Sequence, residues 1–121
     1  VIETILLNII FAGDYKTMMP KLKAKNFSDM ELIRPMYLVK EEAIIRFMKS
    51  TGLNPLDCAC TVTKKKSGNK RYYVKELVKS LLKENENADI NILRSSENVN
   101  LGQILGYKNK GQKHLFTEFY E

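Results

Sequence analysis

The most regular apolar pattern in this chain of 121 residues lies between residues 74 and 82, where it predicts an amphipathic helix. Apolar residues recur there with the spacing of one helical face, and charged residues occupy positions between them. The apolar set is Val74, Leu77, Val78, Leu81 and Leu82, and the charged set is Lys75, Glu76, Lys79 and Lys83. The pattern fades in the polar stretch of residues 84–87.

Three further segments are also predicted to be helical. Residues 2–11 carry an apolar stripe widened by neighbouring apolar positions, so this helix is expected to be buried on most of its circumference and to stop at Gly13. Residues 40–51 form a second helix that ends at Gly52, and residues 88–94 form a short one before a loop at 95–100. The inner side of the second helix is expected to hold Ile44, Ile45, Phe47 and Met48.

One strand is predicted, over residues 31–39. Pro35 interrupts it and favours a terminal or edge position in a sheet. The preceding residues 21–31 show little periodicity and are interpreted as a polar turn, and residues 53–69 as a loop. In the tail, an apolar cluster at helical spacing is expected to pack on the first helix, with a partner-binding end as the alternative; the cluster is Leu115, Phe116, Phe119 and Tyr120.

Composition favours a single globular domain, with 44% apolar and 28% charged residues. No apolar run approaches the roughly 20 residues of a membrane span, and no signal-peptide layout is present, so a cytoplasmic location is expected. The net charge of +6 favours an anionic partner such as RNA. Solvated lysine-rich faces are the alternative explanation of that charge.

Several small motifs follow one another in a fixed order along the chain. They are Glu3-Thr4, Asn8, Gly13, Met18-x-Pro20-Lys21, Ile33-Arg34-Pro35, Glu41, Cys58-Ala59-Cys60 and Lys70-Arg71. Their order, and the spacings from Gly13 to Pro20-Lys21 and from Arg34 to Glu41, resemble the second half of PP-loop ATPases of the tRNA 2-thiocytidine synthetase family. The resemblance covers residues 1 to about 95.

The resemblance implies an α-rich α/β fold, the C-terminal half of an adenine nucleotide α-hydrolase-like (PP-loop) domain, with about three main helices and one or two strands. The family's ATP-binding loop, paired Asp and central Cys-x-x-Cys would all precede Val1. The chain is therefore expected to be a single fragment, with residues 1–95 from the PP-loop domain and 96–121 an unassigned tail. It is expected to be inactive alone.

For the whole protein, the resemblance implies ATP-dependent thiolation of a tRNA cytidine. ATP with Mg²⁺ would activate a base carbonyl, and a sulfur donor protein is an expected partner. The apolar surface of the first helix suggests a homo-oligomer.

Cys58 and Cys60 are candidate metal ligands because thiolates are soft ligands for iron, but two cysteines are too few for a closed four-ligand site. The resemblance implies a 4Fe-4S cluster held by two upstream cysteines and one cysteine of this region. Counting from Lys70-Arg71 favours Cys60, and counting from Pro55 favours Cys58. Inert cysteines are the alternative.

Glu3, Thr4 and Arg34 are the candidate catalytic residues. Glu3 and Thr4 lie nearest the missing ATP site, although a glutamate favours the first turn of any helix. The guanidinium of Arg34 can bind phosphate, and hence a nucleotide cofactor, in a bidentate geometry. A salt bridge to Glu31 or Glu41 is the alternative role for Arg34.

A cationic segment around Gly68 is the candidate RNA contact, consisting of Lys64, Lys65, Lys66, Lys70 and Arg71. Tyr72 adjoins it and can stack on an unpaired base, whereas Tyr73 is expected to close the start of the helix that follows. A second basic strip follows the first helix, at Lys16, Lys21, Lys23 and Lys25. The alternative function is a small basic RNA-binding or protein-interaction module without catalysis.

Overall fold

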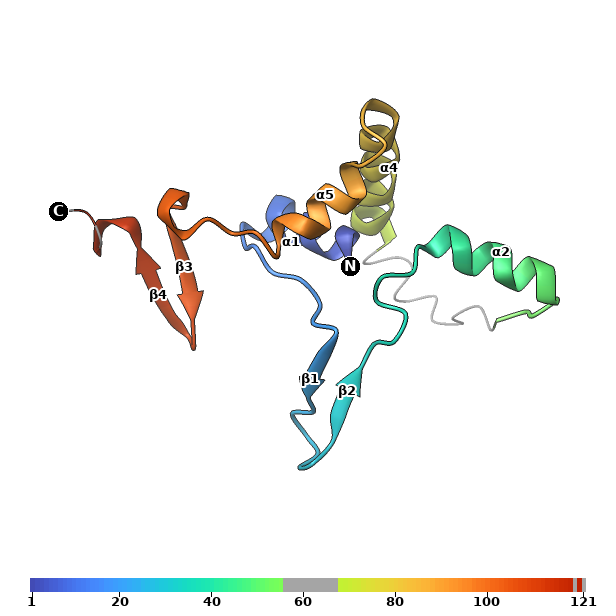
Figure 1. The fold of residues 1–121 in the computed structure, drawn as a ribbon, viewed down its shortest axis with the longest axis horizontal. Helices are drawn as coiled ribbons and strands as arrows, with labels where there is room; N and C mark the ends of the chain where they lie inside the picture. Colours follow the sequence, from blue (N-terminus) through green and yellow to red (C-terminus); the bar gives the residue numbers. More distant parts are fainter. Residues whose placement is uncertain (56–67, 119, 121) are drawn as a thin grey trace.

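The computed structural model describes residues 1–55, 68–118 and 120, and these residues combine helices with two small antiparallel sheets. Figure 1 shows α1 (Ile2–Ala12), α4 (Gly68–Glu84) and α5 (Ala88–Ser95) meeting at the centre, with α2 (Glu41–Thr51) and the hairpins extending away from them. The elements are α1 (Ile2–Ala12), β1 (Lys21–Lys23), β2 (Glu31–Ile33), α2 (Glu41–Thr51), α4 (Gly68–Glu84), α5 (Ala88–Ser95), η1 (Leu101–Gln103), β3 (Gly106–Asn109), β4 (Gln112–Leu115) and η2 (Phe116–Glu118). The expected mixture of α and β structure is therefore confirmed.

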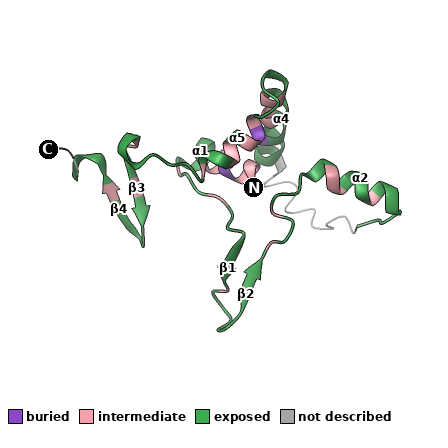
Figure 2. Ribbon diagram, in the orientation of Figure 1, coloured by how far each residue is buried: buried purple, intermediate pink, exposed green. Residues whose placement is uncertain are grey.

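The core lies where α1 contacts α4 and α5. Ile5 of α1 and Val74 of α4 are both 0% exposed, and they are the only fully buried apolar residues among those described. Most of the remaining surface is open to solvent, as Figure 2 shows. The expectation that α1 is buried on most of its circumference was wrong, because Ile9, Ile10 and Phe11 are each more than 40% exposed.

The predicted end of α1 is confirmed. Gly13 adopts a left-handed conformation with φ 60°, which a residue without a Cβ takes at little energetic cost. The N–H of Asp14 then donates to the carbonyl of Asn8 at 3.1 Å. Gly52 ends α2 in the same way, with φ 71°.

The first hairpin corrects two predictions. Residues 21–31 are not a turn throughout, because Lys21–Lys23 form β1 and pair antiparallel with β2, with Leu22 opposite Leu32. The predicted strand over residues 31–39 is only three residues long, since the chain turns immediately after it. All six strand residues are exposed, so backbone pairing defines these strands and the sequence carries no alternating apolar pattern that would predict β1.

The helices α2 and α5 confirm the predicted positions to within one residue at each end. The predicted inner side of α2 is wrong in part. Ile44 and Met48 are half-buried, but Ile45 and Phe47 are 41% and 61% exposed, and no residue of α2 is buried.

The tail forms a second hairpin. Lys110 and Gly111 form its turn with φ 49° and 80°, and Tyr107 lies opposite His114. A side chain on Gly106 would place its Cβ 2.5 Å from the carbonyl oxygen of His114, so this position requires glycine. The expected helical packing of the tail on α1 was wrong: Leu115 ends β4, Phe116 begins η2, and Phe116 and Tyr120 are 50% and 80% exposed.

No helix in the described ranges is both long enough and apolar enough to cross a membrane.

Because the buried core is small, shortening Ile5 should destabilise the chain measurably. Ile5→Val should lower the free energy of unfolding by about 1 kcal/mol, as expected for removal of one buried methylene group. The control Ile10→Val changes a residue that is 44% exposed and should change the free energy of unfolding by less than about 0.5 kcal/mol. Urea unfolding followed by circular dichroism measures both, and equal effects would contradict this description of the core.

Candidate functional site

Arg34 joins two of the sequence motifs. Its guanidinium donates to the carbonyl of Met19, and its backbone N–H donates to the carbonyl of Pro20 at 2.9 Å. The hydroxyl of Tyr37 donates to the carbonyl of Met18 at 2.7 Å. The segment after β2 thus holds the segment before β1 in place by binding its backbone.

The alternative salt bridges expected for Arg34 are not formed. Glu31 pairs with Lys21 at 2.8 Å, and Glu41 pairs with Lys75 at 3.2 Å. Arg34 is half-buried, and at least part of its guanidinium serves the backbone of the Met18–Pro20 segment. A role of Arg34 in nucleotide binding stays a prediction.

Glu3 and Thr4 lie in the first turn of α1, as expected from the sequence. The carbonyl of Thr4 accepts a hydrogen bond from the side-chain amide of Asn8 at 2.9 Å. The same amide reaches the carbonyl of Lys16 at 3.4 Å, so Asn8 connects α1 to the segment that follows it. These contacts explain Asn8 structurally, and the catalytic candidacy of Glu3 and Thr4 stays a prediction.

The start of α4 carries the described part of the cationic candidate site. The ammonium of Lys70 lies 5.1 Å from the centre of the Phe11 ring, a cation–π geometry, and Tyr73 contacts the same ring edge-on with centroids 6.1 Å apart. Tyr73 therefore closes the start of the helix against α1, as the sequence predicts. Arg71 is exposed, and Tyr72 is 66% exposed, so both are accessible to a ligand.

Cys58, Cys60, Lys64, Lys65 and Lys66 lie outside the described residues, so their predicted roles stay predictions. Within the described ranges, no group of three His, Cys, Asp or Glu side chains is placed to hold a metal ion. Two cysteines alone do not complete the ligand set of a 4Fe-4S cluster. The residues of this chain therefore do not by themselves fit such a cluster.

An ion pair that sequence reasoning missed connects α2 to α5. The ammonium of Lys40, at the start of α2, lies 2.9 Å from the carboxylate of Asp89, which is only 7% exposed. The hydrogen bond from Lys40 lowers the pKa of Asp89 below its ordinary value and raises the pKa of Lys40. Because the residues are 49 positions apart, no local pattern in the sequence identifies the pair.

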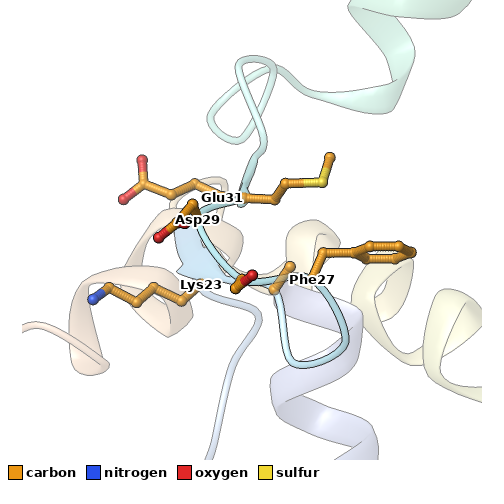
Figure 3. Close-up of a pocket in the computed structure, with 7 residues that line it drawn as sticks. Lys23, Phe27, Asp29 and Glu31 are labelled. Atoms are coloured by element: carbon orange, nitrogen blue, oxygen red, sulfur yellow. The ribbon is translucent and has the colours of Figure 1, made fainter.

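A small hollow of about 350 Å³ lies in the loop between β1 and β2 (Figure 3). The charged ends of Lys23, Asp29 and Glu31 point to one side of this loop, and the ring of Phe27 points to the other (Figure 3). Glu31 is already paired with Lys21. This mixture of charges favours neither an anion nor a cation, so the hollow is a weaker candidate than the start of α4.

The second hairpin also contains contacts of His114 that sequence reasoning missed. His114 stacks on Tyr107 with ring centroids 4.9 Å apart, and its Nδ1 lies 3.1 Å from a carboxylate oxygen of Glu118. His114 had no role in the sequence-based interpretation. A signal was available, because the Lys110-Gly111 pair between two short polar segments is compatible with a two-residue hairpin turn.

Comparisons with known proteins give one consistent result. The chain is 36% identical over 104 residues to a tRNA-cytidine(32) 2-sulfurtransferase of Geobacter metallireducens, an alignment that covers 86% of this chain and 40% of the relative. It is 39% identical over 98 residues to the protein of the same name from Geotalea uraniireducens, and this alignment covers 81% of this chain and 38% of the relative. It is 34% identical over 110 residues to the protein of the same name from Pelobacter propionicus, and this alignment covers 91% of this chain and 40% of the relative.

The matched region is the C-terminal part of these relatives, and the chain spans about 40% of their length. No family model and no solved structure matches the chain. The resemblance stated from the ordered motifs is confirmed by these relatives.

The pair between Lys40 and Asp89 predicts a specific dependence of stability on pH. The folded pKa of Asp89 is lowered, so the pair's contribution should be complete above the ordinary pKa of 3.8 and lost as pH falls through the folded value. Asp89→Asn should therefore lower the urea midpoint at pH 7, and this difference from the native chain should shrink as the pH falls below 3.8.

The control Glu76→Gln removes an exposed carboxylate that pairs with Lys79 at 3.2 Å within α4. Exposed pairs of this kind contribute little to stability, so its effect at pH 7 should be smaller than that of Asp89→Asn. A constant difference for Asp89→Asn across this acidic range would show that the carboxylate charge does not stabilise the fold.

Proposed function

We propose that this chain, a homologue of the C-terminal part of the tRNA-cytidine(32) 2-sulfurtransferases, takes part in the transfer of sulfur to a cytidine of tRNA. The observation that carries the proposal is 34–39% identity over 81–91% of the chain with relatives that share this name. Because the chain spans about 40% of those relatives, the activity belongs to the whole protein and is proposed for it as a whole.

The chemistry proposed for the whole protein is ATP-dependent activation of the base, with Mg²⁺ as the companion of ATP, followed by sulfur delivery. One thiolate, of Cys58 or Cys60, is proposed as a ligand of an iron-sulfur cluster whose other ligands would come from outside this chain, and such a cluster would supply sulfur chemistry to the whole protein. A separate sulfur donor protein and a cytoplasmic location are part of the same proposal. Arg34 is proposed to bind nucleotide phosphate only with the guanidinium nitrogens that do not bind Met19.

The proposed tRNA contact of this chain is the start of α4. Arg71 and Tyr72 are exposed there, and the exposed ammonium of Lys70, 5.1 Å from the centre of the Phe11 ring, would add a further cation for a phosphate. Lys64, Lys65 and Lys66 come four to six positions before Lys70 in the sequence and would add three cations to this contact. An exposed tyrosine beside a group of cations suits an unpaired nucleotide.

The exposed apolar residues of α1 support a second part of the proposal, self-association. Ile9, Ile10 and Phe11 each leave more than 40% of their surface in solvent. We propose that a homo-oligomer covers them. Light scattering that gives the mass of a monomer at all protein concentrations would contradict this.

The second candidate is a basic RNA-binding module without catalysis, which the net charge of +6 and the exposed cations of α4 favour. The two candidates differ in the predicted effect of the cysteines. Only the thiolation proposal requires them, whereas both candidates require the cations.

The test of thiolation uses the complete coding sequence that contains this chain, expressed in a bacterial strain whose tRNA lacks 2-thiocytidine. Mass spectrometry of the tRNA nucleosides should detect 2-thiocytidine. A double variant, Cys58→Ser with Cys60→Ser, should abolish the product and keep the affinity for tRNA. Absence of 2-thiocytidine from the native sequence, with tRNA binding intact, would favour the module without catalysis.

The start of α4 generates a further prediction about salt dependence. The double variant Lys70→Gln with Arg71→Gln should flatten the slope of log affinity for tRNA against log salt concentration by about 1.4 to 1.8, since each lost phosphate contact removes roughly 0.7 to 0.9. The matched control Lys79→Gln with Lys83→Gln removes the same charge from the other end of α4 and should leave the slope nearly unchanged. Equal changes in both variants would show that only net charge matters.

A further inference from the structure

An open groove of about 910 Å³ lies beside the second hairpin, on a part of the chain that the proposed tRNA contact does not use. Its walls come from three segments: the connector after α1, the connector between α5 and β3, and the hairpin β3–β4 itself. The hydroxyl of Tyr15 lies 2.8 Å from that of Ser95, so the first two walls are joined directly. Figure 1 shows the hairpin lying apart from the helical core.

Two lysines occupy directly opposite positions on the hairpin wall. The register pairs Lys108 of β3 with Lys113 of β4, and both line the groove. Opposite residues on neighbouring antiparallel strands point to the same face with Cβ atoms roughly 5 Å apart, and like charges at such positions destabilise the pair. An anion in the groove would relieve this repulsion.

One carboxylate offsets only part of the positive charge. Asp14 lies 3.5 Å from the ammonium of Lys16 and 3.6 Å from that of Lys108, so two lysines share it. Lys113 has no ion pair within the described part of the chain. The groove is therefore lined by two lysines and one carboxylate, Lys16 adds a third cation beside that carboxylate, and the excess positive charge favours an anionic ligand.

The rest of the groove is suited to a nucleobase. Val99 and Leu105 line it and are 47% and 77% exposed, which provides apolar surface that is otherwise in contact with water. Asn98 and Gln103 line the same groove, and amide side chains can donate to or accept from the edge of a base, although the amide of Asn98 already donates to the carbonyl of Arg94 at 3.0 Å. Tyr15 also lines the groove and is 46% exposed, and cations beside an exposed aromatic ring are typical of surfaces that bind single-stranded RNA.

We infer that this groove binds a single-stranded segment of RNA, with the sugar–phosphate backbone between Lys108 and Lys113 and a base against Leu105. The inference rests on the proposed function only for the identity of the RNA as tRNA. The charge of the groove, the strand register and the lining residues support binding of single-stranded RNA of any origin. An acidic protein segment would use the two lysines but would leave the amides and the apolar floor without a base.

The inference is tested by fluorescence anisotropy with the 121-residue chain and a labelled, unstructured RNA of about ten nucleotides. Lys108→Gln with Lys113→Gln should flatten the slope of log affinity against log salt by about 1.4, because each phosphate contact on a single strand contributes about 0.7. The control Lys49→Gln with Lys83→Gln removes the same charge from α2 and α4 and should leave the slope within about 0.3 of the native value.

The hairpin should remain folded in the glutamine variant, because the substitutions remove a repulsive pair. A second variant, Lys108→Arg with Lys113→Arg, keeps the charge and should retain the native slope. Binding unchanged in the glutamine variant, equal loss in the control, or no RNA binding by the native chain would each overturn the inference. Displacement of RNA by polyglutamate at an equal concentration of charge would assign the groove to an acidic protein instead.

These results are independent of the thiolation assay. If 2-thiocytidine forms and the glutamine variant binds RNA normally, the inference of RNA binding in the groove fails and the proposed function stands. If the slope of log affinity against log salt flattens in the glutamine variant as predicted and no 2-thiocytidine forms, the inference stands and the thiolation proposal fails.

Discussion

The contact between α1 and α4 is the interaction on which the described structure depends. Ile5 and Val74 lose all exposure there, and no other apolar residue in the described ranges is fully buried. The helix α5 also packs on both α1 and α4. The remaining elements are attached to this centre mainly by polar contacts: the pair of Lys40 with Asp89, the pair of Glu41 with Lys75, and the hydroxyl contact of Tyr15 with Ser95. Such contacts position an element without burying it.

This division explains where ligands can bind. The second hairpin is not buried and leaves its side chains available, whereas α4 belongs to the core but exposes Arg71 and Tyr72 at its start. The start of α4 presents Arg71 and Tyr72 next to the packed ring of Phe11, and the second hairpin presents Lys108 and Lys113 beside an apolar floor. Both combine positive charge with a surface on which a base can rest. The proposal of RNA as the ligand thus follows from the two surfaces as well as from the relatives.

The parts of the fold that sequence reasoning found are those with a local cause. The ends of α1 and α2 follow from Gly13 and Gly52, and the position of α4 follows from its apolar face. The strands were harder to predict because β1 has no apolar alternation, and only its backbone pairing with β2 defines it. The burial of α1 and the packing of the tail were overestimated, since apolar residues were assumed to find partners that the described residues do not supply.

The same distinction applies to the candidate site. Arg34 and the cations near Gly68 were found because they stand out in the sequence, but the backbone role of Arg34 required the fold that brings Met19 to it. The pair of Lys40 with Asp89, and the opposition of Lys108 and Lys113, join residues whose relation only the tertiary structure or the strand register reveals.

Ultraviolet cross-linking of the chain to a tRNA transcript, followed by mass spectrometry of the linked peptides, would show whether both cationic surfaces contact RNA. We expect cross-links at two places: the peptide containing Tyr72 and the peptides of the groove around Tyr15 and Tyr107. Cross-links confined to the loop between β1 and β2, or none at either predicted place in a complex that binds tRNA, would contradict this expectation.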